Sequence, residues 1–270
     1  MTAVVETQGL TKLYGRLGAL RDLSIAVPEG SVFALMGASG AGKTTAIKIL
    51  LNMIAPSSGR ASILGADSRH LCPATLGRVG YVSENQSLPV RLRVADFFDY
   101  IRPAYPHWDR DVERRLREQL RLPPDRRIRD LSHGMRMKLA LASALAFRPR
   151  LLVLDEPFTG LDALARDEIV REFLQHVPET SILISSHELD EIERLATHVA
   201  FLHEGSLLFQ GTLAGLREYA APLAAPSGPA AAAPSGPAAA APGGPAAAAP
   251  PDTTLRGLFV RVVRGRFASK

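Results

Sequence analysis

The stretch SVFALMGASGAGKTTAIKIL, residues 31–50, decides how the rest of the chain is interpreted. It begins with a short apolar run that ends in glycine, as buried strands of parallel sheets do. Residues 37–44, GASGAGKT, match the pattern GxxxxGK[ST], whose glycines let backbone N–H groups surround phosphate oxygens. A helix is expected from Lys43 to Ile54, with one apolar face. The stretch therefore predicts a strand, a phosphate-binding loop and a helix in succession.

This pattern predicts a nucleotide site with a metal ion. Lys43 can reach the β- and γ-phosphates of a nucleoside triphosphate, and Thr44 can hold Mg²⁺. The candidate nucleotide-binding residues of the loop are Gly37, Ala38, Ser39, Gly40, Ala41, Gly42, Lys43, Thr44 and Thr45.

Two further apolar runs end in side chains suited to phosphate chemistry. RLLVLDEP ends with Asp155 and Glu156, and SILISSH ends with His187. Asp155 can complete the Mg²⁺ shell, and Glu156 can accept the proton of an attacking water. His187 can bond the γ-phosphate or orient that water, although a surface histidine behind an N-cap serine remains the alternative.

The aromatic residue Tyr14 stands near the N-terminus in LTKLYG. An aromatic face can stack on adenine, which makes Tyr14 a candidate nucleotide contact. A tyrosine of the core or of an edge strand is the alternative.

Composition limits the classes of function. The chain has 270 residues with a net charge of +5 and no dense basic run, so charge gives a nucleic-acid role little support. Cys72 is the single cysteine, which excludes an internal disulfide and fits a reducing compartment. The first residues lack the pattern of a signal peptide, and no apolar run of the folded part could cross a bilayer. We therefore expect a soluble or peripheral protein.

The order of the patterns predicts three parts. Residues 1–219 alternate apolar strands with helical periodicity, which predicts an α/β domain with a parallel sheet, and residues 86–130 form an Arg-rich helical subdomain within it. Residues 198–211 are expected to form a hairpin. Residues 220–251 repeat Ala, Pro and Gly and predict an extended linker. Residues 252–270 predict a basic amphipathic helix.

The segment LSHGM, residues 131–135, predicts a second phosphate site, because it opens a helix with a serine. Together with Tyr14, the phosphate loop, LLVLDEP, Gly160-Leu161-Asp162 and His187, it resembles the motif set of ABC transporter nucleotide-binding domains. The resemblance covers about residues 3–218. It implies a P-loop NTPase parallel-sheet core with an N-terminal antiparallel β subdomain and an inserted helical subdomain.

The resemblance also implies a mechanism. Such domains bind ATP and Mg²⁺ and dimerise head-to-tail, so that Ser132, His133 and Gly134 face the γ-phosphate of the ATP on the partner chain, which is a second copy or a homologous ATPase subunit. Asp162 belongs to a further nucleotide-site loop of the family. The alternative for LSHGM is a plain helix cap.

Two positions depart from the family pattern. His133 stands where the family usually has glycine, which places a titratable ring beside the phosphate. Glu84 follows Gly-Tyr-Val-Ser where the family usually has glutamine, and Gln86 comes two residues later. Glu84 can still reach Mg²⁺, but its charge puts coupling to the membrane partner in question.

The function implied is an ATP-hydrolysing subunit that powers a separate integral-membrane permease. YPHWD (105–109) and LSHGM resemble a bacterial exporter-type subgroup, so export is expected, from a cytoplasmic position at the inner face of the cell membrane. No nucleic acid is expected as a partner. The alternatives are an ABC ATPase acting on the ribosome or nucleic acid, and a nucleotide-binding regulator without turnover. The terminal helix can dock on its own domain, bind the permease or lie on an anionic membrane.

Overall fold

The computed structural model describes residues 2–176, 180–187, 192–221 and 254–268. Nearly all of the linker predicted over residues 220–251 lies outside these described residues. The predicted boundaries of the three parts stay a prediction.

A six-stranded sheet runs through the centre of the described residues, in the order β11-β10-β4-β9-β8-β7. Neighbouring strands from β10 to β7 are parallel, and β11 pairs antiparallel with β10. The parallel sheet and the hairpin predicted over residues 198–211 are therefore confirmed. The strands are β4 (Val32–Met36), β7 (Val79–Ser83), β8 (Leu151–Asp155), β9 (Ser181–Ser186), β10 (His198–His203) and β11 (Ser206–Thr212).

Alternate residues of the central strands point into two separate apolar cores. In β4, Val32, Ala34 and Met36 belong to one core, while Phe33 and Leu35 belong to the other. A strand that is apolar at every position suits this arrangement, because both faces of the sheet are covered. The two cores explain why the apolar runs of the sequence lack alternation.

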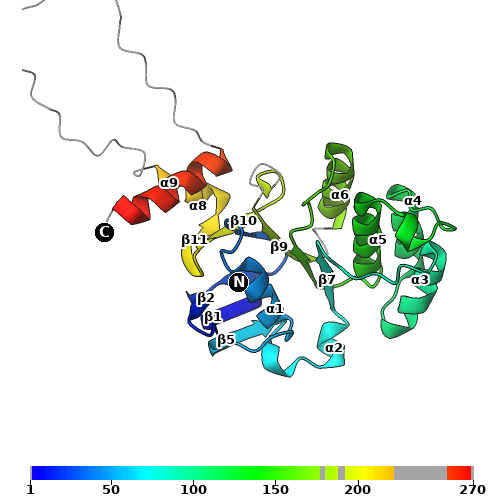
Figure 1. The fold of residues 1–270 in the computed structure, drawn as a ribbon, viewed down its shortest axis with the longest axis horizontal. Coiled ribbons are helices and arrows are strands. Elements are labelled where there is room, and N and C mark those ends of the chain that lie inside the picture. The colour runs from blue at the N-terminus through cyan, green and yellow to red at the C-terminus, as the bar shows by residue number, and fades with distance from the viewer. Residues whose placement is uncertain (1, 177–179, 188–191, 222–253, 269–270) are drawn as a thin grey trace, which may run out of the picture.

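An antiparallel sheet covers one face, and its order is β2-β1-β5-β6 with β3 beside β1. Helix α1 packs into the same core through Ile47, Ile49 and Leu50. Figure 1 shows this sheet and α1 together below the central sheet. The bounds are β1 (Ala3–Tyr14), β2 (Leu17–Leu23), β3 (Ala26–Pro28), α1 (Lys43–Leu50), β5 (Ser58–Ile63), β6 (Ala66–Asp67), η1 (Ser68–His70) and α2 (Pro73–Leu76).

The helix α1 is shorter than predicted, since it ends at Leu50 instead of Ile54. Asn52 has φ 57°, in the left-handed region that ends helices. Asparagine tolerates this conformation better than most residues. The apolar periodicity continues past this point, but the backbone turns away.

Helices cover the other face of the central sheet (Figure 1). Most of them contribute to the core that contains Val32, Ala34 and Met36. Their bounds are α3 (Val94–Ile101), η2 (Arg102–Ala104), α4 (Arg110–Gln119), η3 (Ile128–Asp130), α5 (His133–Leu145), α6 (Ala163–His176), α8 (Leu213–Ala220) and α9 (Leu255–Ala268).

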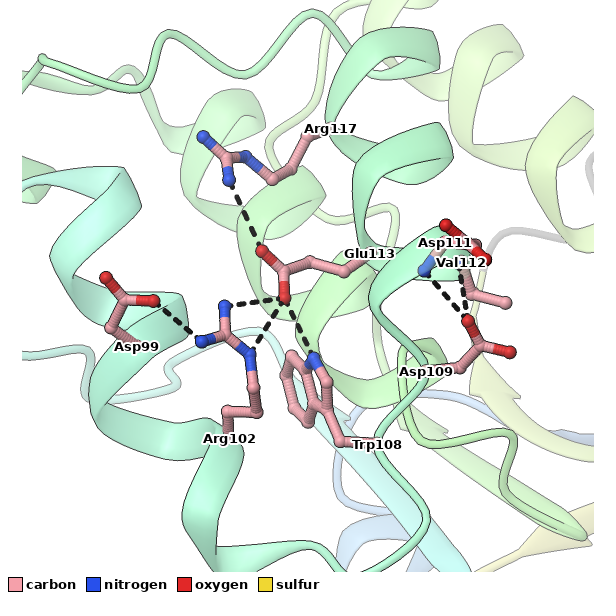
Figure 2. Close-up of polar contacts among 8 residues, drawn as sticks. All are labelled: Asp99, Arg102, Trp108, Asp109, Asp111, Val112, Glu113 and Arg117. Carbon is pink, nitrogen blue, oxygen red and sulfur yellow. Dashed lines mark hydrogen bonds and ion pairs between the residues drawn. The ribbon is translucent and has the colours of Figure 1, made fainter.

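A buried carboxylate organises the α3–α4 region (Figure 2). Glu113 is 4% exposed and accepts hydrogen bonds from Arg102 (2.9 Å), Trp108 (2.8 Å) and Arg117 (3.3 Å). Two arginines and an indole N–H thus compensate one buried charge, as burial of a charge requires.

The motif YPHWD fastens this region to the end of α5. The Tyr105 ring stacks on Phe147, with centroids 4.1 Å apart. Asp109 caps α4 by accepting from the Asp111 and Val112 N–H groups (2.9 and 3.0 Å) and also accepts from Arg148 (2.9 Å). These contacts give Tyr105 and Asp109 of the motif a structural role.

The terminal helix α9 docks on the chain's own domain, beside α8 and β11 (Figure 1). Leu255, Leu258 and Val262 are buried in the core, and the Phe259 ring lies 5.0 Å from that of Phe201 in β10. Of the three alternatives for this helix, the structure shows the first.

Candidate functional site

The parallel strands bring the predicted motifs to one edge of the sheet. Asp155 at the end of β8 pairs in register with Ser83 of β7 and Ser185 of β9, and Met36 of β4 pairs with Ser186. The segments that follow β4, β7, β8 and β9 therefore start side by side. Ligands of open α/β sheets bind at this edge.

The loop after β4 needs glycine at two positions. A Cβ on Gly37 would lie 2.4 Å from the Leu202 carbonyl oxygen, so the backbones approach too closely for any side chain. Gly42 has φ 104°, and a Cβ there would lie 2.5 Å from the Ala19 carbonyl oxygen. Gly42 also precedes α1 without a side-chain cap, which leaves the first N–H groups of this helix available to an anion.

Lys43 is buried under this loop. Its ammonium donates to the carbonyl oxygens of Gly37 (2.6 Å) and Ala38 (3.2 Å), and it lies 3.1 Å from a carboxylate oxygen of Glu156. The side chain is only 5% exposed, so its charge is held at the base of the loop. A charged group so deeply buried requires such partners.

Thr44 and Asp155 form a pair of oxygen ligands. The Thr44 hydroxyl donates to Oδ1 of Asp155 at 3.0 Å, and the Ser185 hydroxyl donates to the same oxygen at 2.6 Å. A hydroxyl and a carboxylate oxygen suit a hard divalent cation such as Mg²⁺. The donor set therefore fits the metal that the sequence predicts.

Glu156 stands between a lysine and a histidine. One carboxylate oxygen contacts Lys43, and the other lies 2.7 Å from Nδ1 of His187 and 3.3 Å from the His187 N–H. Glu156 has φ 53°, a left-handed conformation that is strained for a residue with a side chain. Its N–H donates to the Ser185 hydroxyl (3.1 Å) and helps to hold this conformation.

A cleft of about 390 Å³ opens beside these groups. It brings together most of the phosphate loop, Glu84, Glu156 and His187, whereas Gly37, Ala38 and Asp155 do not line it. Its lining residues are Ala19, Ser39, Gly40, Ala41, Gly42, Lys43, Thr44, Thr45, Glu84, Glu156, Thr159 and His187.

Tyr14 does not line this cleft. It is the last residue of β1, its side chain is 48% exposed, and Lys12 Nζ lies 5.0 Å from its ring centre. The core alternative for Tyr14 is therefore excluded. Its stacking on adenine stays a prediction.

Glu84 and Gln86 face different cavities. The Glu84 N–H donates to the Asp155 carbonyl oxygen (3.0 Å), and Glu84 lines the cleft. Gln86 lines a separate groove of about 260 Å³, and its side chain accepts from the Ser83 N–H (3.4 Å). The glutamate thus occupies the side of the loop that faces the phosphate loop.

The residues of LSHGM lie outside the cleft. Ser132 is exposed and caps α5 by accepting from the Met135 N–H (3.2 Å), so its own hydroxyl proton stays free to be donated. His133 Nε2 lies 3.1 Å from the carbonyl oxygen of Thr159 in the same chain.

Asp162, of the motif Gly160-Leu161-Asp162, also lies outside the cleft. Its side chain caps α6 by accepting from the Ala165 N–H (2.8 Å).

Two functional candidates escaped prediction from the sequence. Ser185 is fully buried and bonds both Asp155 and the Glu156 N–H, and a polar residue within the apolar run SILISS was the available signal. Thr159 lines the cleft, and its place directly before the motif Gly160-Leu161-Asp162 was the available signal.

A family model described as "ABC transporter" matches residues 20–159. The chain is an ATP-binding protein of the ABC transporter family. Relatives of this ABC protein include the bacitracin transport ATP-binding protein BcrA of Enterococcus faecalis, 32% identical over 81% of this chain and 72% of that protein. The Nod factor export ATP-binding protein I of Neorhizobium galegae is 33% identical, over 78% of this chain and 62% of that protein.

Solved structures agree with the fold of this ABC protein. An ATP-binding subunit of an ABC transporter superposes with a TM-score of 0.74 at 29% identity, over 80% of this chain and 92% of that chain. The predicted fold class is therefore confirmed. Within the described residues, the helices are all too short or too polar to span a membrane.

Proposed function

We propose that this chain hydrolyses ATP and thereby powers a separate membrane permease. The observation that carries the proposal is the position of Glu156 on the wall of the cleft, between Lys43 and His187. A carboxylate held at both oxygens, beside a phosphate loop, is placed to act on a water molecule.

The predicted site residues in and beside the cleft have proposed parts in hydrolysis. The N–H groups of the loop and Lys43 bind the phosphates of ATP, while Thr44, Asp155 and Glu84 hold Mg²⁺. When bound, Mg²⁺ neutralises the charge that develops on the phosphate oxygens. Glu156 accepts a proton from the attacking water, and His187 orients the Glu156 carboxylate through the 2.7 Å contact.

We propose that the complete site needs a second chain. Ser132 and Gly134 lie outside this chain's cleft, and Ser132 is exposed at the start of α5. The Ser132 hydroxyl proton and the positive end of the helix dipole favour an anion there. In a head-to-tail dimer this anion is the γ-phosphate bound by the partner chain.

We place the permease at the groove lined by Gln86. Aromatic and aliphatic residues make up most of the wall of this groove of about 260 Å³, among them Tyr81, Phe97, Tyr100 and Phe147, and polar residues complete it. Tyr100 is 72% exposed, which is unusual for a tyrosine unless a partner covers it. Glu84, two residues before Gln86, connects this groove to the nucleotide cleft. The transport and export names of the relatives support a permease of the exporter type.

Two substitutions test hydrolysis and dimerisation together. Glu156→Gln is expected to lower kcat about 100- to 10,000-fold, because the proton acceptor is lost. Without hydrolysis, ATP should hold Glu156→Gln as a dimer of about twice the 29.0 kDa of one chain in light scattering. Lys43→Ala should lose both turnover and dimerisation.

The matched control is Glu218→Gln, which changes an exposed glutamate on α8 and should behave as wild type. Wild-type turnover in Glu156→Gln would refute the role of this carboxylate. A Glu156→Gln chain that stays monomeric with ATP at every concentration would refute the dimer.

A further inference from the structure

His133, which stands in LSHGM where the family usually has glycine, makes a specific contact within its own chain. His133 is the first residue of α5, and its Nε2 lies 3.1 Å from the Thr159 carbonyl oxygen. Its ring also covers Gly160, where a Cβ would lie 3.6 Å from the ring carbon Cδ2. A glycine at position 133 could make neither contact.

The segment that receives this contact is part of the wall of the nucleotide cleft. Thr159 lines the cleft three residues after Glu156. Its N–H donates to the Glu156 carbonyl oxygen over a long 3.4 Å, and its hydroxyl is buried without a hydrogen-bond partner among the described residues. Phe158 and Leu161 anchor the segment in the core, but Thr159 itself has few polar contacts other than the one to His133.

Further contacts join α5 to α6, the helix that follows this segment. A Cβ on Gly134 would lie only 3.2 Å from the Cβ of Ala165 in α6, so α5 and α6 approach closely. Lys138 of α5 forms an ion pair with Glu168 of α6, and both side chains are largely buried. The packing of α5 against α6 therefore holds the start of α5 close to the segment that leads from Glu156 into α6.

We infer that His133 is a positioning residue that couples the two nucleotide sites of the dimer. This rests on the proposed function, in which the start of α5 binds the partner's phosphate while Glu156 acts on this chain's own ATP. The hydrogen bond from His133 to Thr159 links these two places within one chain. Phosphate contact at Ser132 is thereby transmitted to the wall beside Glu156.

The chemistry of the hydrogen bond between His133 and Thr159 determines which substitutions of His133 can retain it. Because a carbonyl oxygen accepts, Nε2 of His133 must carry the proton. The glutamine amide can donate from a similar position, whereas alanine cannot. His133→Gln is therefore the conservative variant and His133→Ala the disruptive one, and both suit the first turn of a helix.

The coupling is tested by ATPase kinetics on the full chain. His133→Ala should lower kcat about tenfold, the effect of losing about one hydrogen bond, with less than twofold change in the KM for ATP. The Hill coefficient for ATP should fall from its wild-type value towards 1. His133→Gln should restore kcat and the Hill coefficient to within about twofold. His107→Ala, at an exposed histidine just before α4, should match wild type in all three.

Hydrogen exchange of residues 157–162 gives a measurement that needs no turnover. His133→Ala should raise exchange there several-fold without nucleotide, and His133→Gln should not. Unchanged exchange and kinetics in His133→Ala would overturn the inference, as would a His133→Gln chain as impaired as His133→Ala. If the wild-type chain neither hydrolyses ATP nor dimerises, the proposed function fails and the coupling fails with it. If the wild-type chain does both while His133→Ala keeps wild-type kinetics, the coupling alone is overturned, even where exchange rises.

Discussion

Ser185 organises both acidic residues of the site from a neighbouring strand. Its hydroxyl donates to Asp155 and accepts from the N–H of Glu156, and the residue is 0% exposed. The Glu156 N–H also donates to the Ser185 carbonyl oxygen (3.2 Å), so two oxygens of Ser185 hold the strained left-handed conformation of Glu156. One hydroxyl thus fixes the proposed metal ligand and the proposed base relative to each other.

Replacing Ser185 with alanine should impair both stability and catalysis. The Asp155 carboxylate loses a donor in the buried region, so the free energy of unfolding should fall by about 1–2 kcal/mol in urea denaturation. The kcat for ATP should fall about tenfold, because Glu156 is held less firmly.

Ser68→Ala is the matched control for this prediction. Ser68 is also buried, but its hydroxyl has no hydrogen-bond partner among the described residues, so its loss should be nearly neutral. Equal effects of Ser185→Ala and Ser68→Ala on stability would contradict the argument.

At the scale of the element, the helices of the α3–α4 region are held by polar contacts at their ends and by the buried Glu113. Asp109 caps α4 and also pairs with Arg148, which follows α5. The hydrogen bond from the Val112 N–H, together with Arg148, lowers the pKa of Asp109 below its ordinary value. The cap therefore joins two helices and depends on the charge of the carboxylate.

Substitutions of Asp109 should show this charge dependence. Asp109→Ala loses the cap and should cost about 1 kcal/mol of stability at pH 7, while Asp109→Asn keeps a capping oxygen and should cost less. A carboxyl whose pKa is lowered by folding adds stability above its unfolded pKa of about 3.9, and that stability is lost as the pH falls through the folded pKa.

The advantage of wild type over Asp109→Asn should therefore shrink as urea denaturation is repeated from pH 7 down to pH 3. A constant difference between these two proteins across that range would show that the charge of Asp109 contributes nothing.

At the scale of the whole molecule, the nucleotide cleft and the aromatic groove lie on the two sides of the segment that follows β7. Glu84 lines the first and Gln86 the second. Burial raises the pKa of Tyr81, which lines the groove, above the ordinary value of a tyrosine. A partner bound in the groove would therefore contact the same segment, Glu84 to Gln86, that lines the nucleotide cleft.

Tyr100→Arg should weaken assembly with the permease. The charged side chain would enter the apolar groove and lose the aromatic contact, so the amount of a co-expressed membrane protein that co-purifies with the chain should fall at least tenfold. Met53→Arg places the same charge on another exposed apolar residue and should leave co-purification unchanged. Equal yields with Tyr100→Arg and Met53→Arg would remove the groove from the proposed interface.

The amino-acid sequence by itself determined the sheet core, the hairpin and the position of the phosphate loop. These follow from local patterns. An apolar run, a glycine-rich loop and a helical period can each be recognised from residues that are adjacent in the sequence. Lys43, Thr44, Asp155 and Glu156 were found in this way because their motifs directly follow buried strands, and strand ends meet at one edge of a parallel sheet.

The tertiary structure alone decided the contacts between distant segments. Local periodicity could not show that α1 ends at Leu50, that α9 docks beside β11, or that Ser185 holds Asp155 across two strands. It also could not show that His133 faces Thr159 of its own chain, because residues 26 positions apart meet only through the packing of α5 against α6. Such contacts depend on how the elements pack around the core, which the local sequence pattern does not encode.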